Sequence, residues 1–262
     1  MVQNRVALAV AVAREHAFPA REERVLSAGV LTTVVEIGGI VARVAAPGFS
    51  VGEAVAIAAH VAARGGPVVP PARVVDPGPH YRQGLVVSFW ERVARPEPAD
   101  PRVVARRLRE LHEALADFPL PLADFAHPTE ALLRLDRVAE TPDHELLRDA
   151  LSLPAEGGQA LHGDAAVTNC IAGGDWIDFD LAARGPREGD VATLVMRDWV
   201  HRQEGEAAEA LAAYGPCDRD LIHVCLRAFV ALTCVLLLEQ ATSQPPLASL
   251  LAERLAWLRS TR

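Results

Sequence analysis

Lysine is absent from this chain, and all 26 of its basic residues are arginine. Any phosphate or carboxylate that the protein binds through a side-chain cation must therefore meet a guanidinium group, which is planar and forked, instead of a compact ammonium group. The accompanying abundance of alanine, valine, glycine and proline is typical of a GC-rich coding bias, so the absence of lysine does not by itself indicate a function.

Cysteine is scarce as well. The four cysteines follow no metal-binding or redox spacing, and a disulfide framework is not expected. Cys225 and Cys234 lie in an apolar helical run, which predicts that they are small buried hydrophobic residues.

The chain also lacks an excess of positive charge. Its net charge of −8 argues against nucleic acid as a partner, because phosphate backbones require a basic surface. The same negative charge is compatible with a cationic substrate and equally with ordinary solubility.

No apolar run reaches the length of a membrane span without a charge or a break, so a membrane is not an expected partner. The richest run, residues 228–238, is interpreted as part of a buried helix. The N-terminal apolar run at 6–13 is short and lacks a convincing cleavage site, which favours an amphipathic helix over a signal peptide. These observations predict a cytoplasmic protein.

The composition divides the chain into two parts. Before residue 94, β-branched runs predict strands around a single helix at 51–64, and Gly38-Gly39 predicts a hairpin turn between two of them. The runs are 24–35, 39–44, 68–75 and 85–89. The proline-rich stretch 95–98 is the candidate linker. After it, helices are predicted from Asp100, Thr129, His144, Asp190, Glu204, Arg219 and Leu247. We therefore expect an α+β chain with a small β-rich lobe at 1–94 and a larger, mainly helical lobe at 95–262.

One stretch of the second part brings three oxygen-bearing side chains together. Asp164 is followed five residues later by Asn169, and Asp178 lies beyond the Gly173-Gly174 pair, which predicts a tight hairpin. Kinase-type phosphoryl transfer uses an Asp for the substrate hydroxyl and an Asn and an Asp for Mg²⁺, in this order along the chain. Mg²⁺ prefers oxygen ligands, so the residue types suit it.

Taken singly, Asp164 could be a turn or cap residue and His162 a core histidine. In combination with Asn169 and Asp178 they favour a catalytic site. Asp180 is open between a second metal contact and a helix cap.

The same residues resemble those of a known family. Leu-His-Gly-Asp at 161–164, Asn169, Ile-Asp-Phe-Asp at 177–180, Gly-Pro at 185–186 and Asp-Val-Ala at 190–192 resemble the aminoglycoside phosphotransferase family, which belongs to a kinase-like group with choline and homoserine kinases. Leu-His at 111–112 and Gly-Gly-Pro-Val-Val-Pro at 65–70 extend the resemblance. It implies a two-lobed protein-kinase-like fold.

The resemblance implies a role for each matching residue of the larger lobe. Asp164 would be the catalytic Asp, and Asn169 and Asp178 would bind Mg²⁺. His162 would orient the catalytic loop, and Asp190 would fix that loop through backbone hydrogen bonds.

In the smaller lobe the resemblance implies nucleotide contacts. Arg43 would stand in the place of the phosphate-contacting lysine, with Glu53 as its ion-pair partner. The adenine ring would bind the backbone between Ser88 and Trp90. The segment 27–33 is not a glycine-rich phosphate loop, so the hydroxyl groups of Ser27 and Thr33 are the candidates there.

The implied activity is transfer of the γ-phosphate of ATP or GTP, with Mg²⁺, to a hydroxyl of an aminoglycoside or a similar hydroxylated antibiotic or metabolite. A kinase for choline, homoserine or a sugar is the alternative within the class, and a non-catalytic kinase-like binding protein is the alternative outside it. The protein is expected to be a monomer or a homodimer.

The acceptor is the least determined part of the prediction. Acidic residues of the later helices could bind ammonium groups, but they are more typical of a solvated face; they are Asp198, Glu204, Glu206, Glu209, Asp218, Asp220 and Glu239. Trp199 and Tyr214 could stack on a sugar or a cation, although packing in the core is the favoured interpretation.

Overall fold

The structure of the protein is a computed structural model that describes residues 2–29, 32–46, 51–93, 100–152, 158–171, 173–202, 206–241 and 245–261. The predicted linker at 95–98 and the predicted lobe boundary at residues 94 and 95 lie outside the described residues, as do the helix starts predicted near Ser50 and Glu204.

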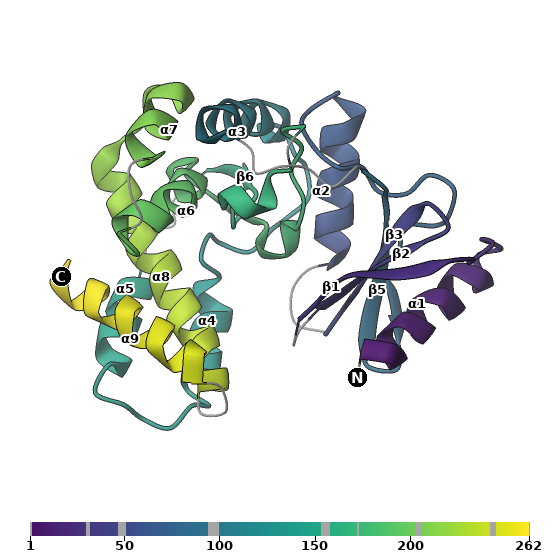
Figure 1. The fold of residues 1–262 in the computed structure, drawn as a ribbon. Helices are drawn as coiled ribbons and strands as arrows, with labels where there is room; N and C mark the ends of the chain where they lie inside the picture. Colours follow the sequence, from purple (N-terminus) through teal and green to yellow (C-terminus); the bar gives the residue numbers. More distant parts are fainter. Residues whose placement is uncertain are drawn as a thin grey trace.

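The N-terminal lobe is built on one antiparallel sheet with the strand order β1-β2-β3-β5-β4. Its elements are α1 (Val2–Glu15), β1 (Glu23–Ala28), β2 (Thr32–Ile37), β3 (Ile40–Ala45), α2 (Val51–Ala63), β4 (His80–Arg82) and β5 (Leu85–Glu91). Helix α1 lies along the outer face of the sheet, and α2 stands between the sheet and the helical part of the molecule (Figure 1).

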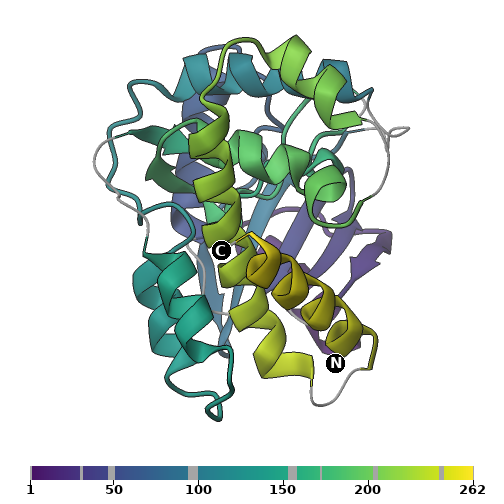
Figure 2. The same ribbon diagram turned by 90° about the vertical axis from the view of Figure 1, so that its left-hand side faces the viewer.

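The C-terminal lobe is mainly helical and contains one two-stranded sheet, β6 with β7. Its elements are α3 (Pro101–Leu115), α4 (Pro128–Leu135), α5 (His144–Leu151), β6 (Gln159–Leu161), η1 (Val167–Asn169), η2 (Phe179–Leu181), β7 (Ala183–Gly185), α6 (Glu188–Trp199), α7 (Glu206–Tyr214), α8 (Arg219–Ala241) and α9 (Pro245–Ser260). When the molecule is viewed from the side of the helical lobe, α8 and α9 lie in front of the sheet of the N-terminal lobe (Figure 2). The predicted two-lobed α+β architecture is confirmed.

The two hydrophobic cores do not divide where the lobes divide along the sequence. One core packs α1 against the outer face of the sheet through residues such as Leu8, Val35 and Phe89. The buried side of α2, including Ile57 and Val61, belongs instead to the large core of the helical lobe. Helix α2 therefore ties the sheet lobe to the helical lobe by burial of apolar surface, which is non-directional and strong.

Helix α8 is the longest element of the protein. Its segment Arg219–Leu238 is long and apolar enough to cross a membrane by length and composition. Much of it is buried in the helical lobe, however, where Leu226, Val230 and Val235 are fully covered. The structure therefore agrees with the interpretation of 228–238 as part of a buried helix.

The prediction of secondary structure failed at several places. The predicted run 24–35 forms two strands, β1 and β2, and β4 was not predicted. No strand forms at 68–75, where Val68 and Pro71 make only isolated bridges; Pro70 and Pro71 have no N–H with which to extend a ladder. The helix expected to be capped by Thr129 begins at Pro128 after His127, with proline in the first turn. The hairpin at Gly173-Gly174 is held by a single bridge between Cys170 and Trp176 instead of two strands.

The end of α1 generates a prediction about stability. Ala17 has φ = 58°, and the amides of Ala17 and Phe18 donate to the carbonyls of Arg14 and Ala13, which is a Schellman motif. The Cβ of Ala17 in this left-handed conformation destabilises the folded state by roughly 1–2 kcal/mol. Glycine removes this cost, but it also raises the entropy of the unfolded chain, which lowers the free energy of unfolding by about 0.4–1 kcal/mol. We expect Ala17→Gly to raise the free energy of unfolding by roughly 0.5 kcal/mol in urea denaturation.

The matched control is Ala11→Gly, which places the same change at an exposed position inside α1. It should lower the free energy of unfolding by about 1 kcal/mol. Destabilisation by both substitutions would contradict the left-handed helix end.

Candidate functional site

The loop that follows β6 carries the first site residues and depends on a glycine. Gly163 has φ = 84°, and a Cβ at this position would lie 1.6 Å from the carbonyl oxygen of Leu181. Only glycine allows the chain to pass so close to the segment that leads into β7. This close approach brings Asp164 next to the residues that follow the hairpin.

A buried carboxylate holds this loop in place. Asp190, in the first turn of α6 and fully buried, accepts hydrogen bonds from the amides of His162 and Gly163, both at 2.8 Å. It also accepts a hydrogen bond from His112 Nε2 at 2.9 Å. Burial alone would raise the pKa of Asp190, but the bonds and charge from His112 and the loop outweigh it and hold the pKa below its ordinary value.

The residue His112 is in turn fixed by a further bond. Its Nδ1 lies 2.8 Å from the hydroxyl of Tyr214, which is buried at the end of α7. In the sequence, His112 only extends the family resemblance, and Tyr214 is predicted to pack in the hydrophobic core. The structure shows that both support Asp190 and hence the loop before Asp164, a role that only their tertiary contacts reveal.

The side chain of His162 is fully buried and bridges two backbone groups. Its Nε2 lies 2.9 Å from the carbonyl oxygen of Ile177, an acceptor, so this nitrogen carries the proton. Its Nδ1 accepts from the amide of Asp164 at 3.3 Å. The ring also packs against Phe179 and Trp176. With both nitrogens engaged by backbone, His162 orients the loop and is not placed to exchange protons with a substrate.

Asp164 and Asn169 are joined directly. The side-chain amide of Asn169 donates to the carbonyl oxygen of Asp164 at 2.9 Å and to its carboxylate at 3.3 Å. These bonds fix the orientation of the Asn169 amide and leave its carbonyl oxygen available to a cation. Burial raises the pKa of Asp164 above its ordinary value, and the neighbouring charge of Asp178 raises it further.

Asp178 and Asp180 face Arg43 across the two lobes. Asp178 has φ = 65°, and its side chain is 44% exposed. Arg43, on β3, donates to Asp178 Oδ1 at 3.2 Å and makes a closer contact with Asp180 Oδ2. The pKa of Asp180 lies above its ordinary value, chiefly because the side chain is buried. The charge of Arg43 opposes this rise, and the charge of Asp178 adds to it. Two adjacent carboxylates thus share one guanidinium, and Asp180 belongs to this cluster of charges.

The expected ion pair between Arg43 and Glu53 is not formed. Glu53 lies in the first turn of α2, which itself favours an acidic residue, and it makes no ion pair within the described part of the chain. Arg43 is drawn instead to the two carboxylates of the other lobe, because two acceptors offer more Coulomb energy than one.

The hydroxyl candidates of the sheet lobe divide between its two faces. Thr33 is fully buried on the face covered by α1, opposite Val44, and lies 3.4 Å from Arg5. Arg43 faces the other side, so the prediction of Thr33 as a nucleotide contact is corrected: successive side chains of a strand point to opposite faces. Ser27, opposite Val34, is exposed and shares the face of Arg43.

Ser88 and Trp90 also lie on the face of Arg43. Ser88 pairs with Arg43 in register and is fully buried, and the indole N–H of Trp90 donates to its hydroxyl at 2.9 Å. The hydroxyl of Ser88 therefore lies at the edge of the half-buried Trp90 ring, and the ring is the more accessible surface.

The backbone of this strand is not available to an adenine ring. The amides of Phe89 and Glu91 donate to Pro77 and Pro70 at 3.0 Å, and the carbonyl of Phe89 accepts from Ala72. The other edge of β5 pairs with β3. This corrects the prediction that the backbone from Ser88 to Trp90 binds adenine; the next backbone groups along the described chain belong to Arg92 and Val93.

The predicted acceptor residues have structural partners. Glu209 pairs with Arg102 at 2.9 Å, and the carboxylate of Asp198 accepts from the amide of Ala207 at 2.6 Å. Asp218 accepts from two amides at the start of α8. Trp199 stacks on His223, with ring centroids 4.5 Å apart. These contacts agree with the favoured interpretation of a solvated face and of aromatic packing; Glu204 and the side chain of Glu239 lie outside the described part of the structure.

One residue near the loop was missed altogether. Arg254, on α9, has a buried Nε without a hydrogen-bond partner, and its guanidinium makes no ion pair within the described residues. Burial lowers the pKa of Arg254, while the charges of Cys234 and Asp164 raise it. No sequence motif marks this arginine, because only the fold brings α9 towards Asp164.

Cys225 and Cys234 are buried, as expected. All four cysteines are free, and burial raises the pKa of Cys170, Cys225 and Cys234 to about 12. Such thiols are not nucleophiles at neutral pH.

The contacts of Asp190 predict a large effect on stability. Asp190→Asn removes the charge that three donors share and should lower the free energy of unfolding by about 3 kcal/mol at neutral pH. Because the folded pKa is lowered, this stabilisation exists above the unfolded pKa and is lost as pH falls. The difference between wild type and variant in urea denaturation should therefore narrow below about pH 4.

Asp149→Asn, at an exposed position with a 3.8 Å contact to Arg227, is the matched control and should change stability by less than about 1 kcal/mol. Equal effects of the two variants would contradict the role of Asp190.

Comparison with known proteins identifies the family. The model of the phosphotransferase enzyme family matches residues 23–221, which include every site residue of both lobes except Arg254. The search of curated proteins found no significant match.

Solved structures with the same fold cover nearly the whole chain. A choline/ethanolamine kinase family protein from Mesorhizobium loti is 18% identical, with a TM-score of 0.68, over 100% of this chain and 95% of its own. An amicoumacin kinase bound to AMP-PNP, Ca²⁺ and its antibiotic is 14% identical, with a TM-score of 0.69, over 90% and 88%. An aminoglycoside phosphotransferase bound to GDP and kanamycin is 17% identical, with a TM-score of 0.63, over 96% and 98%.

These likenesses show the two-lobed kinase-like fold, and the family match shows a phosphotransferase, as the sequence predicted. On the strength of that match over most of its length, the chain belongs to the phosphotransferase enzyme family.

Proposed function

We propose that this protein transfers the γ-phosphoryl group of ATP or GTP to a hydroxyl of an aminoglycoside or a similar hydroxylated antibiotic or metabolite. The observation that carries the proposal is the position of Asp164. Its carboxylate is held by Asn169, its loop is fixed by Asp190, and Arg43 of the opposite lobe reaches the adjacent carboxylates.

Asp164 would accept a hydrogen bond from the acceptor hydroxyl and align its oxygen with the γ-phosphorus. The new bond forms between this oxygen and phosphorus, the bond from phosphorus to the β–γ bridging oxygen breaks, and a nucleoside diphosphate leaves. The hydroxyl proton passes to the carboxylate late in the reaction. The raised pKa of Asp164 suits this task, because a base of higher pKa takes a proton more readily.

The residues present fit Mg²⁺. The side-chain carbonyl oxygen of Asn169 has no hydrogen-bond partner among the described residues, and Asp178 is partly exposed beside Asp180, so the donor set consists of oxygens only. When bound, Mg²⁺ would neutralise charge on the phosphates. Arg43 already shows that the two carboxylates accept a positive partner at this place, and it could turn towards phosphate once they hold the metal.

Two findings support the nucleotide part of the proposal. The chain belongs to the phosphotransferase enzyme family, and solved structures of the same fold contain AMP-PNP with Ca²⁺ or GDP. Asp164, Asn169 and Asp178 are all intact, which argues against a non-catalytic binding protein. Mg²⁺-dependent thermal stabilisation by ATP, followed by turnover with a panel of hydroxylated acceptors, tests the proposal. If ATP neither stabilises the protein nor is turned over, the hypothesis of a non-catalytic binding protein is favoured.

A second candidate acceptor follows from Arg254. Several acidic side chains of the later helices are engaged as caps or ion pairs, whereas Arg254 near Asp164 has no counter-ion in the described structure. A half-buried cation without a partner favours a ligand with an acidic group. Among the alternative acceptors, homoserine carries a carboxylate, whereas choline and unmodified sugars do not. We propose further that the protein acts in the cytoplasm as a monomer or homodimer.

The role of Asp164 predicts opposite effects on activity and stability. Asp164→Asn should lower kcat by about 10²–10⁴-fold and leave the affinity for nucleotide unchanged. It should also raise Tm at neutral pH, because the buried ionised carboxylate lies near Asp178. A raised folded pKa costs stability above that pKa and nothing below the unfolded value, so the gain in Tm should vanish below about pH 4.

Asp175→Asn is the matched control in the same hairpin, where Asp175 faces Arg107 at 3.6 Å. It should leave kcat unchanged. Normal turnover by the Asp164 variant would refute the assignment, and the gain in Tm shows that the variant is folded.

The positive charge of Arg254 leads to a prediction about which acceptors the protein uses. Arg254→Gln should raise the KM for an acceptor with a carboxylate by about tenfold, since one charged hydrogen bond contributes roughly 1.5 kcal/mol or more. The KM for ATP should not change. The measurement is initial rate against homoserine, choline and kanamycin; a variant with unchanged KM for every acceptor would remove Arg254 from the acceptor site.

A further inference from the structure

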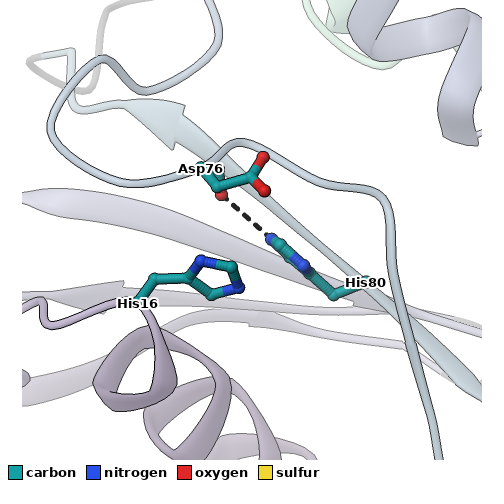
Figure 3. A group of neighbouring side chains, drawn as sticks. All are labelled: His16, Asp76 and His80. Carbon is teal, nitrogen blue, oxygen red and sulfur yellow. Dashed lines mark hydrogen bonds between the residues drawn. The ribbon is translucent and has the colours of Figure 1, made fainter.

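A cluster of two histidines and an aspartate lies on the far side of the sheet from the catalytic residues. His16 follows the last turn of α1, Asp76 lies in the loop before β4, and His80 is the first residue of β4 (Figure 3). One side-chain ligand atom from each residue lies within 4.8 Å of the other two. Figure 3 shows the three side chains converging from separate segments of the chain.

Each residue of the cluster is fixed by its backbone. The Schellman motif at residues 13–18 sets the position of His16 at the end of α1. Asp76 accepts from the amide of Gly78 at 3.1 Å. Gly78 has φ = 89°, and a Cβ there would lie 2.8 Å from the carbonyl oxygen of Val87, so the loop can reach the sheet only with glycine. His80 is buried opposite Val87.

The imidazole of His80 is already oriented. Its Nε2 lies 2.9 Å from the backbone carbonyl oxygen of Asp76, and it packs 4.4 Å from His16 and 5.7 Å from Phe89, measured between ring centroids. Because a carbonyl oxygen only accepts, the proton is on Nε2 and Nδ1 has a lone pair. Metal-binding histidines commonly donate their other ring N–H to a backbone carbonyl in this way.

From these contacts we infer that His16, Asp76 and His80 bind one divalent transition-metal ion of the Zn²⁺ type. In a tetrahedral site with bonds of about 2.0–2.2 Å from Zn²⁺ to nitrogen and oxygen, two ligand atoms lie roughly 3.4 Å apart. The three ligand atoms, which lie within 4.8 Å of one another, would therefore approach by up to about 1.4 Å on binding. Two neutral imidazoles and one carboxylate suit Zn²⁺, whereas Mg²⁺ prefers oxygen ligands alone.

The burial of the three residues indicates the kind of site. His80 is buried, His16 is half-buried and Asp76 is exposed, so the cluster opens to solvent on one side. Three protein ligands with an open side leave a position for water. The site lies on the face covered by α1, whereas Arg43 lies on the opposite face, so it is separate from the proposed Mg²⁺ ligands Asn169 and Asp178.

The metal would link α1 to the sheet. The same elements are already joined by an ion pair between Glu15 and Arg82 at 3.2 Å. At its other end α1 contacts the β1–β2 connection through Arg5, which donates to the carbonyl of Gly29 at 3.3 Å. An ion at His16 would thus fix the helix that also contacts this connection.

The experiment is a calorimetric titration of the full-length, untagged chain with Zn²⁺ in millimolar Mg²⁺, which occupies oxygen-only sites. We expect one Zn²⁺ per chain and a rise in Tm with Zn²⁺. His16→Gln and Asp76→Asn, at the half-buried and exposed positions, should each weaken binding at least about tenfold and abolish the rise in Tm. Both variants avoid the buried His80, so they should fold.

His60→Gln is the matched control. His60 also faces a carboxylate, Asp117 at 3.3 Å, but no third ligand joins this pair among the described residues. The His60→Gln protein should therefore bind Zn²⁺ as tightly as the wild type does. No stoichiometric binding by the wild type, or equal binding by the His16 and His60 variants, would overturn the inference. Neither result bears on phosphotransfer, which is measured separately.

Discussion

The carboxylate of Asp190 is the constraint on which the proposed site depends. It is fully buried and accepts from the backbone of His162 and Gly163, so the chain before Asp164 can take only one path. Burial of an ionised group is costly unless it is fully hydrogen-bonded, and His112 supplies the remaining bond and charge. Because Tyr214 holds His112, four segments far apart in sequence converge on a single carboxylate. The groups that supply these hydrogen bonds all belong to the helical lobe.

The two lobes meet through two different kinds of interaction. The apolar side of α2 is buried in the core of the helical lobe, and Trp176 makes backbone bonds with Pro67 and Val69 just after that helix. The apolar burial is non-directional, whereas the two backbone hydrogen bonds are directional, and both hold the two lobes together. Among the polar contacts between the lobes, Arg43 pairs with Asp178 and Asp180, and Arg64 and His60 pair with Asp117. Asp178 is partly exposed at this contact, whereas the apolar side of α2 is buried.

Much of the architecture could be predicted because it follows from local pattern. The spacing of Asp164, Asn169 and Asp178 around a glycine turn indicated one shared volume, and the structure joins the first two by hydrogen bonds. Two of the wrong predictions concern strands of the sheet lobe. Thr33 and the backbone of Ser88–Trp90 were assigned by their place in the sequence, but strand register turns Thr33 to the opposite face and neighbouring loops occupy the backbone of β5. A shift of one residue along a strand moves a side chain to the opposite face of the sheet, and position in the sequence alone does not determine which face the side chain occupies.

The sequence by itself determined the fold class and the family resemblance, and it indicated that Asp164 and Asn169 lie together. Those features depend on residue type and on spacing within one hairpin, where few conformations are possible. Only the tertiary structure decided that Arg43 pairs with Asp178 and Asp180 instead of Glu53, that Arg254 lies near Asp164, and that His16, Asp76 and His80 form a cluster. Each of these depends on segments that are distant along the chain, and the packing of helices and sheet, which brings such segments together, is not encoded in any local pattern.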